Sequence, residues 1–419
     1  MLALIVGIVL QTDYLHQVAK EVVEASKVEP GAEIAGTGKN LTGYTIRVPG
    51  GTQNYYPAFW IRDAAMMLGG DLVPKEELEG WIKLTASTQP GEKGLTFPHN
   101  LTIPPYSIPD HITLKGEACW FPGAYTDQGV GDYGLLPPAD DAFFFIQMVN
   151  DYVRLSPKSL AFLKQEVKTG WGEQTVWDVT QKAFESVAVA TSGLVLCDEK
   201  QTRVDWGFCD SVRKTGSALM PSLLRWNAAR QLSDVSRGLG LVVEARNYRQ
   251  TADLIRKSIL STFLKPDKPK EAKLISATGL GAQDDVWSSA YAVWLGFLPR
   301  DKEGDVCRHL LRLYKEEGIV MEGQVRHLPK DAFWEQTGSG KGDYQNGAYW
   351  GTPTGWLVYA LSKVDKEAAR KVLADYIAHI KANRSKGAPF EWINASRQVN
   401  ANYASSAGLV YISLHKAKL

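Results

Sequence analysis

Acidic residues stand beside aromatic residues at five places in this chain, and this pairing is the feature that most suggests chemistry. The five segments are Trp60-Ile-Arg62-Asp63, Asp205-Trp206-Gly-Phe-Cys-Asp210, Asp284-Asp285-Val-Trp287, Asp343 to Trp350, and Phe390-Glu391-Trp392. Ionised carboxylates accept hydrogen bonds from hydroxyl groups, and an aromatic ring can cover the C–H face of a sugar ring. Hydrolysis of a glycosidic bond needs two carboxyl groups that flank the bond. The pattern predicts a site for a neutral or weakly charged glycan, and it suits a phosphate or a polyanion poorly.

Each of these acids also has an ordinary structural interpretation. An Asp before a helix often caps its N-terminus, and Asp63, Asp210 or Asp285 could each do so. Arg62 could pair with its neighbour Asp63, or it could grip a hydroxyl or a carboxylate. The loop tryptophans could simply fill the mouth of the fold. The functional interpretation is favoured because acid and aromatic residues occur together at five separate positions.

Neither a metal site nor a bound cofactor is predicted. The chain has no His-x-Glu, Cys-x-x-Cys or glycine-rich phosphate motif, and its seven histidines are scattered. His99 and His111 fall in one long loop, where ordinary loop histidines are the simpler interpretation. The four cysteines lack the spacing of metal ligands and allow three disulfide pairings, between which the sequence does not decide.

The acidic segments stand before helices that recur in pairs. Residues 285–297 are apolar nearly all round, whereas residues 302–315 carry charge on one face. The pair recurs at 353–362 and 366–381, where the apolar residues from Ala369 to Ile380 follow one helical stripe. Buried helices that alternate with half-buried ones describe an inner and an outer ring. The pattern predicts an all-α fold, an (α/α)6 barrel of six helical hairpins.

The remaining hairpins follow the same order along the chain. We expect inner helices over 58–69, 140–154, 216–232 and 400–414, and outer helices over 76–88, 173–188, 243–263 and near 13–25, with an extra helical piece near 158–168 and one strand of a small β-hairpin over 44–48. The long connections, 89–139, 189–215, 264–284, 316–352 and 383–398, each precede an inner helix. They should therefore meet at one mouth of the ring, and long loops on a rigid scaffold commonly carry function.

Composition fits one large domain rather than several. No linker divides the 419 residues, so we expect a single barrel domain over 12–419, and the 47 basic against 46 acidic residues show no footprint for nucleic acid. Residues 1–11 hold a short apolar run that resembles the core of a signal peptide but lacks basic residues before it. This favours an exported protein, with an ordinary helix packed on the barrel as the alternative. No stretch is long enough to span a membrane.

The order of these motifs resembles that of the six-hairpin glycosidases, which include α-L-rhamnosidases and glucoamylases. The segments that carry the rhamnosidase resemblance are Asp205-Trp206 to Asp210 before ALMPSLLRWNAARQL, Ser289-Ala290-Tyr291 to Leu298-Pro299, Gly351-Thr352-Pro353, Phe390-Glu391-Trp392, and Asn402-Tyr403 to Val410-Tyr411. Phe59-Trp60-Ile-Arg62-Asp63 is closer to the Trp-x-Arg-Asp motif of glucoamylase-like barrels. The chain is too short for the accessory β domains of rhamnosidases, and its expected acid is an Asp where they usually have Glu.

The resemblance implies an inverting, exo-acting glycoside hydrolase that releases a terminal neutral sugar such as α-L-rhamnose. It implies that Asp210 is the general acid and Glu391 the general base, with Asp205 as the main rival for the acid role. Arg62 and Asp63 would hold the terminal sugar. The remaining residues expected to bind substrate are Trp60, Asp205, Trp206, Asp285, Trp287, Gln345, Asn346, Tyr349, Trp350 and Trp392. Glu117, Asp132 and Asp343 are more distant candidates for a catalytic role.

Other functions fit the same barrel. A polysaccharide lyase would need a His or Tyr base and basic residues that neutralise a uronate, and only Arg62, Arg203, Arg213 and Arg326 offer themselves. A glycoside phosphorylase would share the hydrolase machinery. A glycan-binding barrel without activity would keep the aromatic residues and lose one carboxylate.

Overall fold

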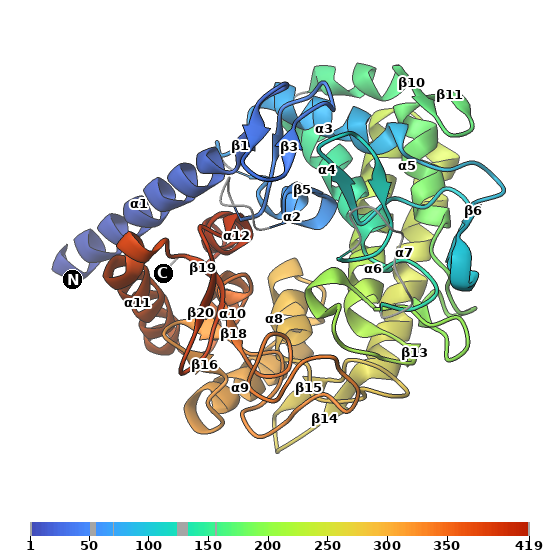
Figure 1. The fold of residues 1–419 in the computed structure, drawn as a ribbon. Helices are drawn as coiled ribbons and strands as arrows, with labels where there is room; N and C mark the ends of the chain where they lie inside the picture. Colours follow the sequence, from blue (N-terminus) through green and yellow to red (C-terminus); the bar gives the residue numbers. More distant parts are fainter. Residues whose placement is uncertain (1, 51–55, 70, 124–132, 156, 418–419) are drawn as a thin grey trace.

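Twelve α-helices within the described residues form two rings, one inside the other (Figure 1). The computed structural model describes residues 2–50, 56–69, 71–123, 133–155 and 157–417. The inner ring consists of α2 (Ile61–Met66), α4 (Asp141–Leu155), α6 (Leu219–Gly238), α8 (Val286–Leu295), α10 (Thr354–Ser362) and α12 (Ala404–Leu414), and the outer ring of α1 (Leu2–Ala25), α3 (Lys75–Ser87), α5 (Val176–Glu185), α7 (Val242–Phe263), α9 (Arg300–Glu316) and α11 (Lys366–Asn383). Each inner helix packs against the next, and α12 packs against α2. The fold is the expected (α/α)6 barrel.

Burial explains why each helix lies in its ring. In α8 every residue from Val286 to Val293 is buried, as the apolar sequence predicts. In α9 the buried residues form one stripe, which runs from Val306 to Leu313. The stripe predicted on α11, from Ala369 to Ile380, is likewise buried. Inner helices such as α8 are apolar all round, and amphipathic helices such as α9 and α11 cover the ring.

Some helices begin later than the sequence pattern predicts, because short strands precede them. β5 (Ala58–Trp60) stands before α2, and β11 (Gly172–Thr175) before α5. β20 (Gln398–Ala401) takes residues that were expected in the last inner helix. β5 pairs with β8 from the loop before α4, and β20 pairs with β19, the preceding strand of its own connection, so strand pairing overrides the helical period there. In the opposite direction, α6 continues to Gly238, six residues beyond the end expected for it.

The loops hold far more β structure than the single small hairpin expected. The strand predicted near residue 46 is β4 (Ile46–Arg47), and it pairs with β1 (Lys27–Val28). The largest sheet has the order β16 (Val320–Met321), β17 (Gln324–Val325), β18 (Tyr349–Trp350), β19 (Phe390–Ile393) and β20, all antiparallel. A three-stranded sheet joins β5, β8 (His111–Thr113) and β9 (Ala118–Cys119). These two sheets position the side chains described below.

The other strands form two-stranded hairpins at the rim of the barrel. They are β2 (Glu33–Ile34) with β3 (Gly38–Lys39), β6 (Leu95–Thr96) with β7 (Thr102–Ile103), β10 (Glu166–Thr169) with β11, β12 (Leu196–Cys197) with β13 (Gly216–Ser217), and β14 (Leu264–Pro266) with β15 (Ala272–Leu274). The extra helical piece expected near 158–168 is a 3-10 segment over Pro157–Lys164.

The segment expected as an export signal continues directly into a helix, because residues 2–25 form the single helix α1. The helix packs against α12 and α11, and both ends of the chain lie on the same side of the molecule (Figure 1). No helix in the described part of the chain combines the length and the apolar composition that crossing a membrane requires.

Candidate active site

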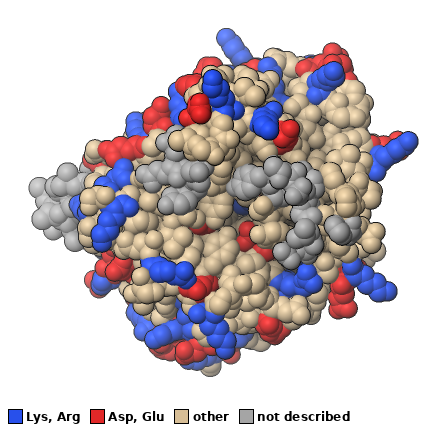
Figure 2. Space-filling model, viewed as in Figure 1, with Lys and Arg blue, Asp and Glu red and all other residues tan. Residues whose placement is uncertain are grey.

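A cavity of about 520 Å³ lies where the loops before the inner helices meet. It is lined by Tyr56, Trp60, Arg62, Asp63, Gly123, Tyr133, Gly207, Phe208, Asp210, Ser211, Gly338, Ser339, Tyr344, Glu391 and Tyr403. Among the described residues, the loop before α8 supplies none of this lining, whereas the five other loops each supply some. Figure 2 shows acidic side chains inside a hollow near the middle of this face. Four of the five long connections therefore meet at this cavity, and the connection 264–284 contributes no described residue to its lining.

Glu391 enters this cavity from β19, inside the five-stranded sheet. The register of β19 and β20 places Glu391 opposite Asn400, because Phe390 pairs with Ala401 and Trp392 with Val399. The Asn400 amide donates a hydrogen bond to the Glu391 carboxylate, and the Tyr56 hydroxyl donates to it at 3.2 Å. Burial raises the pKa of Glu391 to about 8, although both donors oppose this shift. The site therefore holds a carboxyl group that exchanges its proton near neutral pH.

Asp210 faces the same cavity from the end of a short 3-10 turn, Gly207–Cys209. The Gln345 amide donates a hydrogen bond of 2.7 Å to the Asp210 carboxylate. Burial raises the pKa of Asp210 to about 7, while hydrogen bonds from Gln345 and Tyr344 act against the rise. Asp210 also contributes to the raised pKa of Glu391, so the two carboxylates lie close enough to interact.

Asp63 lies in the first turn of α2 and joins the two ends of the inner ring. Its carboxylate accepts hydrogen bonds from the Ser405 hydroxyl at 2.5 Å and the Tyr403 hydroxyl at 3.1 Å. The N-cap residue of α2 is Trp60, so Asp63 is not the helix cap. Burial raises the pKa of Asp63 to about 6. A buried acid that lines the cavity in this way is available to accept hydrogen bonds from a ligand.

Three residues that contact the two carboxylates have left-handed backbones. The φ angles are 51° at Tyr56, 43° at Tyr344 and 53° at Asn400. This region is unfavourable for residues with a side chain, and most of all for a bulky tyrosine. Such strain persists where the surrounding structure fixes it, and it clusters at functional sites. The strained residues support the location of the site at Asp210 and Glu391.

Arg62 is fixed by three buried carboxylates rather than by Asp63. It donates to Asp140 at 3.0 Å, to Asp110 at 2.5 Å and to Asp141 at 3.3 Å. Burial opposes ionisation, but these three acids hold the pKa of Arg62 above its ordinary value. Asp140 also accepts a hydrogen bond from the backbone N–H of Gly207 at 3.0 Å. The Arg62 cluster therefore ties three loops together at the edge of the cavity.

Two of the predicted acids do not line the cavity. Asp205 is fully buried and pairs with Lys214 at 2.8 Å. Asp285 is the N-cap of α8, where it accepts hydrogen bonds from the backbone and the hydroxyl of Ser288 at 2.9 and 2.7 Å. The capping interpretation thus describes the position of Asp285.

The predicted tryptophans divide into one at the cavity and a cluster inside the barrel. Trp60 lines the cavity and stacks on His111 with ring centres 4.1 Å apart. Trp206, Trp287 and Trp350 are buried and meet edge to face, with centroid distances of 6.0 Å between the first two and 5.6 Å between the last two. None of these three is among the residues that line the cavity. They support the loops from within.

The other predicted binding residues hold the loop before α10 in place. Besides its bond to Asp210, Gln345 accepts a hydrogen bond from the backbone N–H of Ser211 at 2.7 Å. Asn346 accepts one from the N–H of Trp334 at 2.9 Å. The Tyr349 hydroxyl donates to the carbonyl of Gly318 at 3.0 Å, and Trp392 lies edge-on to Tyr344 at 6.3 Å. These four residues contact the lining or its supports, and they do not line the cavity themselves.

The sequence did not reveal several residues that form hydrogen bonds with the acids of the site or with Arg62 although they lie elsewhere in the sequence. Tyr344 and Tyr403 stand inside segments that were singled out, but they received no role there. Tyr56, Asn400 and Asp110 carried no local signal, because their contacts span 335, 9 and 48 positions.

Two of the three more distant candidates for a catalytic role lie within the described residues. Asp343 accepts a hydrogen bond from Asn394 at 2.9 Å and pairs with Arg397, and Glu117 is exposed. Asp132 lies outside the described residues. Neither Asp343 nor Glu117 lines the cavity.

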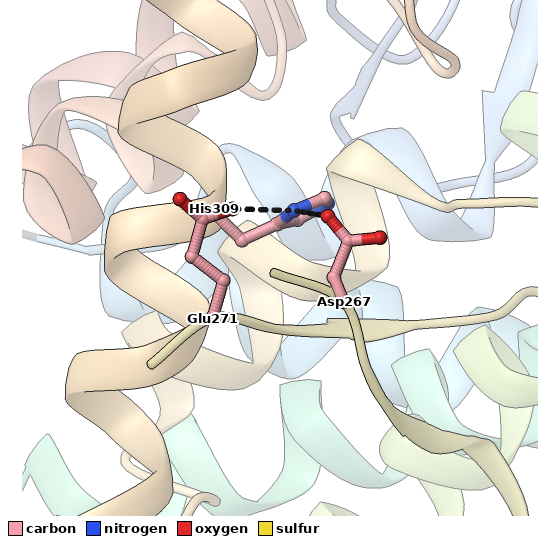
Figure 3. Close-up of side chains that lie close together, drawn as sticks. All are labelled: Asp267, Glu271 and His309. Atoms are coloured by element: carbon pink, nitrogen blue, oxygen red, sulfur yellow. Dashed lines mark ion pairs between the residues drawn. The ribbon is translucent and has the colours of Figure 1, made fainter. Parts of the chain in front are cut away.

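A group with the chemistry of metal ligands lies apart from the cavity, where α9 packs on β15 (Figure 3). It consists of Asp267, Glu271 and His309, and the His309 Nδ1 lies 3.2 Å from an Asp267 oxygen. Arg312 already donates to Asp267 at 2.6 Å and to Glu271 at 2.8 Å. A guanidinium group therefore supplies the positive charge that these carboxylates need.

Comparison with known proteins gives similarity in fold. No family model and no curated protein sequence matches the chain. A rhamnosidase from Klebsiella oxytoca with rhamnose bound is 11% identical, with 95% of this chain and 63% of that chain covered at a TM-score of 0.57. The GH63 mannosylglycerate hydrolase from Thermus thermophilus in complex with glucose is 12% identical, with 95% and 99% covered at 0.56. A glucoamylase from Saccharomycopsis fibuligera is 11% identical, with 97% and 95% covered at 0.56.

These three structures agree with the arrangement of helices and loops described above. The likeness extends over almost all of this chain, and it covers almost the whole length of two of the three neighbours. The chain therefore has the fold of the six-hairpin glycosidases.

Proposed function

We propose that the protein is an inverting, exo-acting glycoside hydrolase with Asp210 and Glu391 as its catalytic pair. One observation carries the proposal: these two carboxyl groups come from different loops, face one cavity, and both have pKa values raised toward neutrality. Glycoside hydrolysis needs a proton donor and a second carboxylate across the scissile bond. Raised pKa values of this kind are a mark of catalytic acids and bases.

The roles within the pair follow from a second cavity of about 270 Å³ beside the first. Its lining includes Tyr133, Asp210, Ser211 and Gly338, which also line the first cavity, but it does not include Glu391. Asp210 thus stands between the two spaces. A sugar in the first cavity and its leaving group in the second would place the glycosidic oxygen next to Asp210. Asp210 is therefore the general acid, and Glu391 activates water from the sugar side.

Hydrolysis requires the pair to hold one proton, on Asp210. In the empty site the pKa values of Asp210 and Glu391 are both raised, to about 7 and about 8, so they do not by themselves place the proton on Asp210. Substrate would favour this placement in two ways. A leaving group in the second cavity excludes water from Asp210, which raises its pKa further, and the attacking water donates a hydrogen bond that favours the ionised form of Glu391.

The proposed mechanism is a single displacement at the anomeric carbon. Glu391 takes a proton from water while the water oxygen forms a bond to the anomeric carbon. The bond from that carbon to the leaving oxygen breaks, and Asp210 gives its proton to this oxygen. Asp63, Trp60 and Tyr403 line the sugar side and would hold the terminal residue. A cavity of about 520 Å³ lies within the range of roughly 300–1,000 Å³ for small-ligand sites, and this favours removal of one terminal sugar.

The neighbouring structures suggest which sugars to test first. Their names and ligands point to rhamnose, glucose and mannose in those proteins. Because α-L-rhamnose was expected here from the sequence motifs, the α-L-rhamnoside is the first substrate, followed by α-glucoside and α-mannoside.

The test is hydrolysis of a panel of glycosides whose alkyl or unactivated aryl leaving groups need a proton, by wild type, Asp210→Asn and Glu391→Gln. We expect both variants to lose at least about 10²-fold in kcat, with the anomeric configuration of the product inverted when followed by proton NMR. Asp343→Asn is the matched control, because Asp343 is an exposed loop acid that pairs with Arg397. Wild-type turnover that survives both substitutions would refute the proposed pair. New ultraviolet absorbance from an unsaturated sugar on uronate polymers would identify a lyase instead.

A further inference from the structure

Two arginines near the catalytic cavity have no ionic partner among the described residues. Of the four arginines considered near the mouth, Arg62 pairs with three aspartates, and Arg326 donates to the backbone carbonyls of Lys330 and Ala332. Arg203 and Arg213 have neither a side-chain hydrogen bond nor an ion pair within the described part of the chain. Both line the second cavity.

Arg203 is the more informative of the two because it is buried. It is 4% exposed, and its Nε atom is buried without a hydrogen-bond acceptor in the described structure. Burial lowers the pKa of Arg203, in agreement with the lack of an acidic partner among the described residues. A buried charge without a partner is costly for folding. Its presence is explained if a ligand supplies the missing negative charge.

The surroundings of Arg203 confirm that the described part of the protein does not supply this charge. A buried acid two positions along the chain, Asp205, is already paired with Lys214 at 2.8 Å. Asp210 is the sole acid among the described residues of the second cavity, and in the proposed mechanism it is protonated. Gln336 and Thr337 complete a polar, uncharged part of the lining.

We propose that this second cavity, here called the Arg203 cavity, binds a leaving group that carries an anionic group, a carboxylate or a phosphate. The proposal rests on the proposed function, because it is the position of Asp210 between the cavities that makes this space the leaving-group side. A planar guanidinium matches either anion with paired hydrogen bonds. The volume of about 270 Å³ has room for a small acid, since one water molecule occupies about 30 Å³ in the liquid. The substrate is then a glycoside of a small hydroxy acid or of a phosphorylated alcohol, rather than a neutral oligosaccharide.

This assignment separates two kinds of recognition within one site. The sugar side is lined by acids and aromatics, as expected for a neutral sugar. The leaving-group side is lined by two cations and amide or hydroxyl groups. The expectation that the mouth would suit an anion poorly holds for the sugar side, and it does not extend to the Arg203 cavity.

Binding of small probes tests the cavity without reference to turnover. Isothermal titration of wild type with sodium glycerate, with inorganic phosphate and with glycerol separates the two anions from a neutral analogue. We expect glycerate or phosphate to bind and glycerol not to, with the better anion identifying the class of leaving group. Arg203→Met should weaken anion binding at least tenfold, and Arg213→Met should weaken it less. Arg237→Met is the control, since Arg237 is exposed on α6 and pairs with Asp234.

Thermal unfolding distinguishes a ligand-binding arginine from a structural one. Because Arg203 lacks a partner in the described structure, we expect Arg203→Met to leave the melting temperature unchanged or to raise it, while anion binding is lost. If neither anion binds, or if the variants bind them as wild type does, the proposal is overturned. A fall in melting temperature with unchanged anion binding would also overturn it, because Arg203 would then serve the fold. Arg213, which is half-buried, gives a second variant should Arg203→Met fail to fold.

Turnover of matched glycosides then connects the cavity with catalysis. The pair shares one sugar and differs in its leaving group, glyceric acid against glycerol. Wild type should prefer the glycerate glycoside by at least tenfold in kcat/KM, and Arg203→Met should abolish this preference. If wild type cleaves both glycosides at equal rates and Asp210→Asn cleaves neither, the proposed hydrolase activity is supported and the proposed anionic leaving group is refuted. Absence of hydrolysis in wild type, with anion binding intact, would refute the proposed function alone.

Discussion

At the scale of single residues, the site is defined by what each carboxyl group touches. Glu391 receives hydrogen bonds from Tyr56 and Asn400, both held in left-handed backbone conformations. Asp210 receives one from Gln345. Neither catalytic candidate has a salt bridge in the described structure, so burial raises the pKa of both without a directly paired cation. This environment is what gives two ordinary carboxylic acids useful proton chemistry near neutral pH.

The leaving group should separate the roles of the two acids. Asp210→Asn should lose about 10²–10⁴-fold in kcat/KM on alkyl glycosides, which need protonation to depart. On a glycosyl fluoride or a dinitrophenyl glycoside, whose leaving groups depart without a proton, the loss should be far smaller. Glu391→Gln should lose activity equally on every substrate, because water must always be activated. Steady-state kinetics of both variants on both substrate types gives the answer, and the opposite pattern would exchange the two roles.

The activity of the wild type should depend on pH as a narrow bell. Below about pH 7 both carboxyls of the free enzyme carry a proton and no base remains, whereas above about pH 8 both are ionised and no acid remains. We expect kcat/KM to be maximal between these values and to fall about tenfold per pH unit on either side. A profile measured from pH 5 to pH 9 checks this. A flat profile across that range would contradict the shared proton.

At the scale of elements, one tight contact between two loops fixes the edge of the cavity. A Cβ atom on Gly207 would lie 1.8 Å from Cζ of Arg62, far inside any allowed contact. The two segments therefore approach so closely that only glycine fits at this position, while its N–H donates to Asp140. The turn that ends at Asp210 takes its position from the Arg62 cluster.

Gly207→Ala should therefore damage catalysis by displacing this turn. Because Arg62 is held by three buried aspartates and cannot yield, we expect the turn to move and kcat/KM to fall about 10²-fold or more. Gly340→Ala is the control, since the atom found closest to a Cβ there is an Asp343 oxygen at an ordinary 3.7 Å. Kinetics and melting curves of both variants measure the effect. Wild-type kinetics in Gly207→Ala would show that the Arg62 cluster does not position Asp210.

The sequence predicted the helices well and the loops only in part, for a physical reason. The buried stripe of α11 repeats every three to four residues, so periodicity alone reveals it. Glu391 and Asp63 each stand near aromatic residues in the sequence, and they do line the cavity. By contrast, the pairing of Asp205 with Lys214 occurs inside an irregular loop. Contacts of this kind follow no sequence period. Two acids of one motif can therefore differ in position, since Asp205 is buried in an ion pair whereas Asp210 lines the cavity.

At the scale of the whole molecule, the buried acids of the site reduce stability as pH rises. The pKa of Glu391 is raised from an ordinary 4.5 to about 8. Between these values the unfolded chain has released the proton that the folded chain still binds, so the free energy of unfolding falls with increasing pH. Below about pH 4 the effect is absent, and above about pH 8 it is complete.

Glu391→Gln should remove this contribution. At pH 8.5 we expect the free energy of unfolding of the variant to exceed that of wild type by on the order of 1–3 kcal/mol, which gives it the higher melting temperature. At pH 4 the two proteins should unfold at nearly the same temperature. Melting curves at both pH values measure the difference, with Asp343→Asn as an exposed control that should show none. A gain that is equal at both pH values would mean that the substitution acts through packing rather than through the proton.

The hydrogen bonds from Tyr403 and Ser405 to Asp63 have a consequence for the order of events during synthesis. They join the first inner helix to the last, at positions separated by about 340 residues. A growing chain on the ribosome would hold Asp63 and Asp210 long before it held Glu391 or the residues that secure Asp63. Catalytic competence should therefore arise abruptly, when the last hairpin docks, and not in stages. The proposed hydrolase should therefore be unable to act on a substrate until synthesis of the chain is almost finished.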